Sequence, residues 1–210
     1  MKIRILLTAF AVICVVSVSK AQSIKETFDS NSLEWNEIPK RVDYGTAIID
    51  KGVLTITSEG SSKFFEAMFG TSYHTWFTCT CYAPLNMDHS FTINTNVTIG
   101  KLDDDKWVGL VFNYKDDGNF YAFIFDEDFV MFIRVIDGRL VGWKNQGMRW
   151  SKKRKAQQNW RLESDGKVLS FFVDDLPIMK MRYMPLDYNG FGYCTFGKQK
   201  LEVDDVEFIQ

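Results

Sequence analysis

Short apolar runs separated by turn residues dominate the hydrophobic pattern of this chain. Between Trp107 and Ile136, three runs rich in Phe, Tyr, Val and Ile are separated by acidic turns at 115–119 and 126–128. Asp-Gly and Gly-Asn pairs tolerate positive φ, so such turns between apolar runs are typical of β-hairpins. Residues 120–125 are apolar in both alternating sets, which predicts a strand that is covered on both faces. The pattern therefore predicts an antiparallel meander in the middle of the chain.

In other segments apolar and polar residues alternate, as in strands with one buried and one solvent-exposed face. Residues 46–57 predict a hairpin that turns at Lys51-Gly52, and residues 91–99 place apolar side chains on one face and polar ones on the other. The apolar pattern stops at 144–158, which predicts a long loop. About fourteen strands and no long helix are expected, which is typical of a single all-β domain, a two-sheet antiparallel sandwich or jelly roll. The remaining strands are expected near 73–82, 139–143, 160–163, 168–173, 177–183, 190–196 and 201–209.

The N-terminus has the pattern of a secretory signal peptide. Lys2 and Arg4 precede an apolar run over 5–16, and small residues stand at the −3 and −1 positions of a cleavage site after Ala21. We therefore expect residues 1–21 to be removed and residues 22–210 to form one exported domain, periplasmic or extracellular. No later run approaches the ~20 apolar residues of a membrane helix, so membrane insertion is not expected.

Composition and charge limit the kinds of molecule that the protein is expected to bind. The chain has 25 basic and 27 acidic residues, a formal net charge of −2. The leader carries three basic residues and no acidic ones, so its removal makes the chain more acidic. A mildly acidic domain has no basic field to attract nucleic acid or anionic lipid. We expect neither as a partner, and the oligomeric state stays open.

Three cysteines remain after the leader, namely Cys79, Cys81 and Cys194. An odd number leaves at least one thiol unpaired, and a bridge from Cys79 or Cys81 to Cys194 stays open because spacing cannot settle it. A Cys-x-Cys pair lacks the usual spacing of a structural zinc site, so buried small side chains are the favoured interpretation.

Four local patterns follow one another along the chain. They are FDSNSLEW at 28–35, WVGLVFNYKDDGNFYAF at 107–123, NWRLESDGKVLSFFVDD at 159–175 and VDDVEF at 203–208. Their order resembles the concanavalin A-like lectin/glucanase superfamily, in the branch related to laminin G-like and family 16 glycoside hydrolase-like domains. The resemblance implies two antiparallel sheets, one of them curved, with a concave face that often holds sugars. The Ala-Gln pair at the expected cleavage site resembles those of exported Bacteroidetes proteins.

The acidic residues of the chain bear on whether it is an enzyme of the kind that this resemblance would imply. Retaining glycosidases place two carboxylates about 5 Å apart, and the family 16 type does so with Glu-x-Asp-x-x-Glu on one strand. The run EVDDVE at 202–207 has this spacing, with Glu202, Asp204 and Glu207 at the three acidic positions, whereas Glu127 lies in a turn. Nucleophile-elbow, phosphate-loop and dinucleotide motifs are missing. A match in spacing does not by itself establish catalysis, so we favour a non-catalytic protein and keep an enzyme as the alternative.

Binding of a sugar needs flat aromatic faces and planar polar groups. The ligand-binding candidates are aromatic residues near the central turns and the expected long loop, together with one amide. For each of them the alternative interpretation is packing in the core. They are Trp107, Asn113, Tyr114, Tyr121, Trp143 and Trp150.

The acidic turns offer carboxylates for a structural calcium ion, with Asp29, Asp204 and Asp205 as candidates. Turn chemistry explains most of these carboxylates without a metal, and no other cofactor is expected.

The sequence thus predicts an exported, lectin-like module that binds a glycan or a cell-envelope component. Two alternatives stay open. One is an enzyme related to glycoside hydrolases with an unrecognised motif, marked by two carboxylates that face each other in a groove. The other is a structural or protein-interaction domain, marked by an apolar outer patch.

Overall fold

The computed structural model describes residues 22–36, 40–42, 44–59, 77–102, 106–147 and 156–210, and these ranges are all-β. The predicted leader lies outside the described residues. Within those ranges no helix occurs that could span a bilayer. The strands are β1 (Ser23–Glu26), β2 (Lys40–Val42), β3 (Gly45–Asp50), β4 (Val53–Glu59), β5 (Phe77–Tyr82), β6 (Ser90–Ile99), β7 (Trp107–Asp116), β8 (Asn119–Phe125), β9 (Phe129–Ile136), β10 (Arg139–Gly147), β11 (Gln157–Asp165), β12 (Val168–Val173), β13 (Leu176–Arg182), β14 (Gly190–Phe196) and β15 (Lys198–Ile209).

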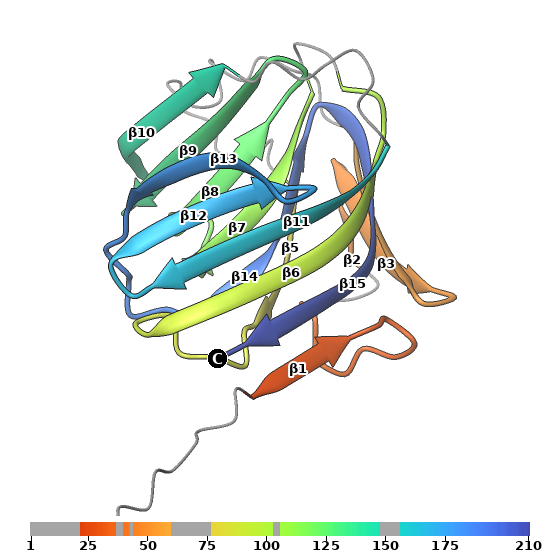
Figure 1. The fold of residues 1–210 in the computed structure, drawn as a ribbon. Helices are drawn as coiled ribbons and strands as arrows, with labels where there is room; N and C mark the ends of the chain where they lie inside the picture. The colour runs from red at the N-terminus through yellow and green to blue at the C-terminus, as the bar shows by residue number, and fades with distance from the viewer. Residues whose placement is uncertain (1–21, 37–39, 43, 60–76, 103–105, 148–155) are drawn as a thin grey trace, which may run out of the picture.

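The strands form two antiparallel sheets that pack as a sandwich (Figure 1). The nine-stranded sheet has the order β13-β12-β11-β6-β15-β4-β3-β2, and β1 pairs with the last part of β15. The six-stranded sheet has the order β10-β9-β8-β7-β14-β5 and contains the predicted central meander. The two-sheet antiparallel architecture expected from the sequence is confirmed.

Turn residues fix two of the hairpins, and the first of them lies where the sequence predicted it. Lys51 and Gly52 have φ values of 52° and 76° between β3 and β4, and Asp137 and Gly138 have 49° and 70° between β9 and β10. Two successive residues with positive φ match the right-handed twist of the strands that they join. The hairpins that build both sheets are therefore set by local chemistry.

Aromatic rings fill the space between the sheets. The ring of Phe123 on β8 stacks on that of Phe171 on β12, with centroids 4.9 Å apart, and Phe125 meets the edge of Trp160 at 4.8 Å. The N-terminal segment closes one side, because Trp35 is buried and stacks on Tyr193. Burial of such large rings provides the main stabilisation of the sandwich.

A second apolar cluster lies on the outer face of the six-stranded sheet. It includes Val111, Ala122, Ile124 and Ile133, and none of its buried members is more than 6% exposed. Strand β8 is thus buried on both faces, as its sequence predicted. This outer face is therefore not a free surface in the structure.

Two features differ from the predicted elements. Strand β10 runs to Gly147, where a loop was expected from residue 144, because its backbone pairs with β9 as far as Phe129. The short strands β1 and β2 had no clear apolar pattern, and each is held by pairing with one neighbour. Backbone pairing with a distant strand can extend an element beyond its apolar pattern.

The cysteines form no disulfide among the described residues. Cys79 and Cys81 point into the core between the sheets, whereas Cys194 belongs to the cluster on the outer face. Strands β5 and β14 are neighbours, but the side chains alternate, so Cys194 lies opposite Thr78 and points away from the other two thiols. This sidedness rules out the bridge that the sequence left open.

Candidate functional site: a groove at the loop end of the sandwich

A β-bulge at Asn113 shapes one end of the molecule. In the pairing of β14 with β7, Gly190 lies opposite Tyr114 and Phe191 opposite Phe112, so Asn113 is an extra residue without a partner position. The bulge reverses the alternation of β7: Phe112 points into the core, whereas Tyr114 packs beside the cluster on the outer face. Bulges re-aim side chains in this way and are frequent next to functional sites.

The side chain of Asn113 holds the loop between β13 and β14 through hydrogen bonds. Asn113 is fully buried, with a φ of 45° that asparagine tolerates better than most residues. Its Nδ2 donates to the carbonyl oxygens of Tyr188 and Leu186 at 2.9 and 3.3 Å, and its Oδ1 accepts from the Tyr183 hydroxyl at 2.8 Å. Asn113 therefore positions this loop from beneath, and a ligand cannot reach its amide in this structure.

Gly190 completes the junction between β14 and β7. A Cβ atom at this position would lie 2.1 Å from the carbonyl oxygen of Tyr114. No side chain can occupy that space without a shift of the backbone. The glycine lets the two strands approach closely at the point where the loop enters the sheet.

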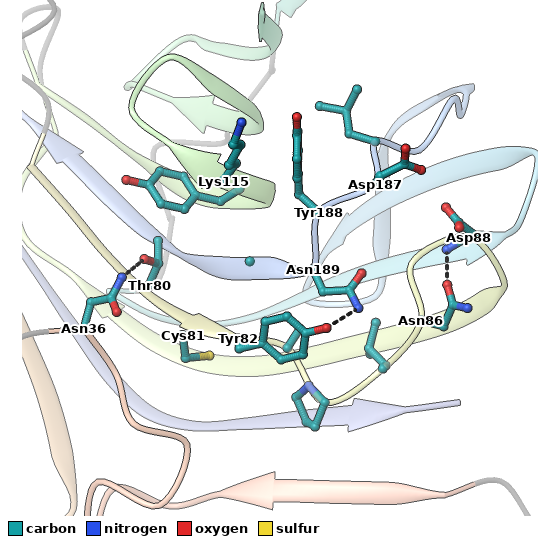
Figure 2. A pocket seen from close by; sticks show the side chains of 16 residues that line it. Asn36, Thr80, Cys81, Tyr82, Asn86, Asp88, Lys115, Asp187, Tyr188 and Asn189 are labelled. Atoms are coloured by element: carbon teal, nitrogen blue, oxygen red, sulfur yellow. Dashed lines mark hydrogen bonds between the residues drawn. The ribbon is translucent and has the colours of Figure 1, made fainter.

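An open groove of about 770 Å³ lies above this junction (Figure 2). Its walls come from Asn36, from the end of β5 and the β5–β6 loop at 80–88, from Tyr114 and Lys115 of β7, and from 186–190. Four segments that are distant in the sequence thus build one site, because they all end at the same edge of the sandwich.

Three tyrosines give the groove its aromatic character. Tyr82 is 72% exposed, and its hydroxyl accepts a hydrogen bond from Asn189 Nδ2 at 3.1 Å. Tyr188 is half-buried, with the Lys115 ammonium 5.1 Å from its ring centroid. Figure 2 shows the two rings on either side of Asn189. The groove thus presents an exposed ring whose orientation is held by a neighbouring amide.

The third ring, Tyr114, is partly enclosed. Its hydroxyl donates to Asp117 at 2.8 Å. Burial, followed by the negative charge of Asp117, raises the pKa of Tyr114 well above its usual range. The phenol therefore stays neutral at physiological pH and serves as a hydrogen-bonding wall of the groove.

Polar groups surround the rings. Asn36 Nδ2 donates to Thr80 Oγ1 at 2.9 Å, and the exposed carboxylates of Asp88 and Asp187 lie on the loops of the two sides. Asn86 is fixed by the C-terminal residue: its backbone N–H donates to Gln210 Oε1, and its carbonyl accepts from Gln210 Nε2, both at 2.8 Å. A groove whose loops are held in place loses less entropy when a ligand binds.

The predicted ligand-binding residues are distributed over several places. Tyr114 lines the groove, and Asn113 lies beneath it. Trp107 is buried in the cluster on the outer face, and the hydroxyl of buried Tyr121 donates to the Met184 carbonyl at 2.8 Å, outside the groove. The Trp143 side chain and all of Trp150 lie outside what the structure describes, so these two candidates stay predictions.

Sequence reasoning missed Tyr82, Tyr188 and Asn189. The available signal was the composition of the two loops, since Tyr82 follows directly on a strand and the run Asp187-Tyr188-Asn189-Gly190 combines an aromatic ring with an amide before a glycine. What the sequence could not supply was the proximity of the two loops, which depends on the pairing of β14 with both β5 and β7.

The carboxylates proposed as calcium ligands each interact with a different partner. Asp29 accepts from Thr27 Oγ1 at 2.8 Å, and Asp205 pairs with Lys25 Nζ at 2.9 Å and accepts from Asn96 Nδ2. Asp204 lies near Gln157, with 3.4 Å between the nearest polar atoms. In the part of the chain that the structure describes, no three acidic, histidine or cysteine side chains converge as metal ligands.

Comparison with known proteins agrees with this architecture. Neither a protein-family model nor a curated protein sequence matches the chain. Among solved structures, a β-glucanase of Bacillus licheniformis superposes with a TM-score of 0.60 at 11% identity, covering 89% of this chain and 97% of the glucanase. The CBM2 module of the evolved Dit protein of Lactobacillus casei phage J-1 gives a TM-score of 0.58 at 11% identity, covering 90% and 96% of the two chains.

A third structure contains the fold as one part of a larger chain. A xylan β-1,4-xylosidase of Bacillus halodurans superposes with a TM-score of 0.59 at 13% identity, covering 89% of this chain and 39% of the xylosidase. At such identities the likeness establishes the jelly-roll sandwich fold and nothing about the ligand.

Proposed function

We propose that the groove binds a glycan and that the protein is a non-catalytic, lectin-like module. The observation that carries this proposal is the exposed ring of Tyr82, held by Asn189 and set in one groove with Tyr188. Aromatic faces stack on the C–H groups of sugars, and amides such as that of Asn36 orient sugar hydroxyls. The fold is also that of structures named as a glucanase and a xylosidase, which is consistent with a glycan ligand.

Export is part of the same proposal. The charged start, the apolar run over 5–16 and the small residues before position 22 support removal of residues 1–21 and action in the periplasm or outside the cell. Glycans of a cell envelope or of the surroundings are the ligands accessible there.

A glycan array probed with residues 22–210 tests the proposal. We expect Tyr82→Ala to lower affinity for any bound glycan about tenfold, since an aromatic contact is worth about 0.5–1.5 kcal/mol beyond the area that it buries. Phe129→Ala is the matched control, because Phe129 is an aromatic residue that is 44% exposed and lies outside the groove. Absence of glycan binding by the unaltered protein, or equal binding by Tyr82→Ala, would overturn the proposal.

Hydrolysis is the second candidate function, and one observation favours it. Asp88 and Asp187 come from different loops and line the same groove (Figure 2). Both are exposed, whereas the general acid of a glycosidase needs surroundings that favour its protonated form. Release of reducing sugar from a bound glycan, abolished by Asp88→Asn or Asp187→Asn, would establish an enzyme in place of a binding module.

The third candidate, a protein-interaction domain, required an exposed apolar patch on a sheet. The apolar cluster on the six-stranded sheet is buried, so it provides no such patch in this structure. The groove remains the surface with the strongest features for a ligand.

A further inference from the structure

A second, smaller pocket opens between the edges of the two sheets. It measures about 240 Å³ and is lined by β9 and β10 on one side and by the end of β13 and the residues that follow on the other. Lys144 joins the two sides, since its Nζ donates to the carbonyl oxygen of Lys180 at 3.2 Å. The pocket and the groove have no lining residue in common, so the pocket is a distinct site.

The charged groups of this pocket all have the same sign. Arg134, Lys144 and Arg182 line it, and no carboxylate of the described residues does. None of the three forms an ion pair within the described ranges of the chain. The chain as a whole has a slightly negative net charge, whereas this small pocket carries three positive charges without ion-pair partners.

Arg134 is held in a geometry suited to an anion. Its guanidinium lies over the ring of Tyr121, 5.3 Å from the centroid, which fixes the plane of the group. Its Nε is buried and has no hydrogen-bond partner among the described residues. A guanidinium held over a ring in this way is suited to a charge-assisted hydrogen bond with an oxyanion.

The other walls of the pocket are apolar, or their polar groups already form hydrogen bonds within the protein. Phe132 and Tyr121 form buried walls, and the hydroxyls of Tyr121 and Tyr183 donate to the Met184 carbonyl and to Asn113 Oδ1. Among the lining residues that the structure describes, the side-chain polar groups left for a ligand are therefore the donors of the three cations. A ligand that fits must supply acceptors and negative charge at one end and an apolar or ring-shaped body at the other.

We propose that this pocket binds a carboxylate carried on a body the size of one six-membered ring. Two sources share that chemistry, an acidic sugar unit such as a uronic acid and a simple ring carboxylate. The proposal does not depend on the groove, since the Tyr82 side chain does not line the smaller pocket.

Methyl resonances of methionine provide a local readout, because Met181 and Met184 line the pocket. Residues 22–210 labelled at the methionine methyl groups are titrated with glucuronate and with benzoate. The uncharged counterparts, glucose and benzyl alcohol, are titrated in parallel. We expect saturable shifts of the Met181 and Met184 signals with a carboxylate and none with the uncharged molecules. Shifts with glucuronate alone identify an acidic sugar site, and shifts with benzoate identify a site for ring carboxylates in general.

Variants test the role of the cations. Arg134→Gln is expected to weaken carboxylate binding at least about tenfold, and Lys144→Gln combined with Arg182→Gln, at two exposed positions, to weaken it to a similar extent. Arg139→Gln is the matched control, since Arg139 is an exposed cation of β10 outside the pocket. Tyr82→Ala is expected to leave these shifts unchanged, which separates this site from the groove.

Three results would overturn the proposal: no shift of either methionine with both carboxylates, equal shifts with the uncharged molecules, or the same loss of affinity in Arg139→Gln as in the pocket variants. The double variant keeps the test decisive if Arg134→Gln does not fold.

Discussion

The outer faces of the two sheets contrast sharply, although both belong to one sandwich. On the nine-stranded sheet, β6 alternates between a buried side and an outer side of Thr92, Asn94, Asn96 and Thr98, which are partly exposed. These outer side chains bond with their neighbours, as Asn96 does with Asp205. On the six-stranded sheet, the outer face carries the buried apolar cluster around Ile124.

The difference between the two outer faces indicates where a ligand can bind. A polar face whose groups already satisfy one another, and an apolar face that is buried, both offer little to a glycan. The groove at the loop end combines an exposed ring with amides held in place, and it arises where the bulge at Asn113 interrupts the six-stranded sheet. The functional site is therefore expected at the edge of the sandwich and not across a sheet.

The largest expected effect comes from the buried outer face. Ile124→Ala should lower the free energy of unfolding by about 2–5 kcal/mol, because Ile124 is fully buried and its removal leaves a cavity. Thr98→Ala on the polar face is the control and should stay within about 0.5 kcal/mol of the parent protein. Urea denaturation measures both. Similar losses at the two positions would remove the contrast between the faces.

The next effect concerns the bulge that ends the apolar face. Asn113→Ala should lower stability by about 2–4 kcal/mol, since it leaves the Tyr183 hydroxyl and two loop carbonyls without their partner. Asn113→Gly relieves the positive φ and should be about 1 kcal/mol less damaging than the alanine variant. If the glycine variant is as stable as the parent, the side-chain bonds do not hold the loop.

A smaller effect is expected at high pH, at the margin of the same face. Burial raises the pKa of Tyr114 in the folded protein above the value of about 10 of an unfolded chain. The folded state then binds the proton more tightly, so this contribution is complete below pH 10 and declines as pH rises beyond it. Unfolding at pH 8 to 11 measures the decline, which should be less steep in Tyr114→Phe. An equal slope would show that Tyr114 is not responsible.

The smallest effect is expected from the cysteines, which lie on opposite faces of one sheet. Because Cys79 and Cys81 point inward and Cys194 points outward, a reducing agent should leave the melting temperature of residues 22–210 unchanged. Thermal unfolding with and without dithiothreitol tests this. A drop in melting temperature on reduction would mean that the thiols can reach one another after all.

Much of the sandwich could be predicted from particular residues. The alternation of 91–99 identified β6 and its buried side, and Lys51-Gly52 identified the first hairpin. The doubly apolar run 120–125 identified the strand with two buried faces. The site was harder to predict, since Tyr114 was found, Tyr82 and Tyr188 were missed, and Asn113 proved to act from beneath the groove.

The sequence by itself determined the strands, their turns and the aromatic interior, because alternation and turn chemistry act between residues close together in the chain. Only the tertiary structure decided that Asn113 is a bulge, since an extra residue is defined by the register of β14 against β7. It also decided which loops share the groove and on which side of the sheet each cysteine lies. These features depend on contacts between residues as far apart as Asn86 and Gln210, which no local pattern encodes.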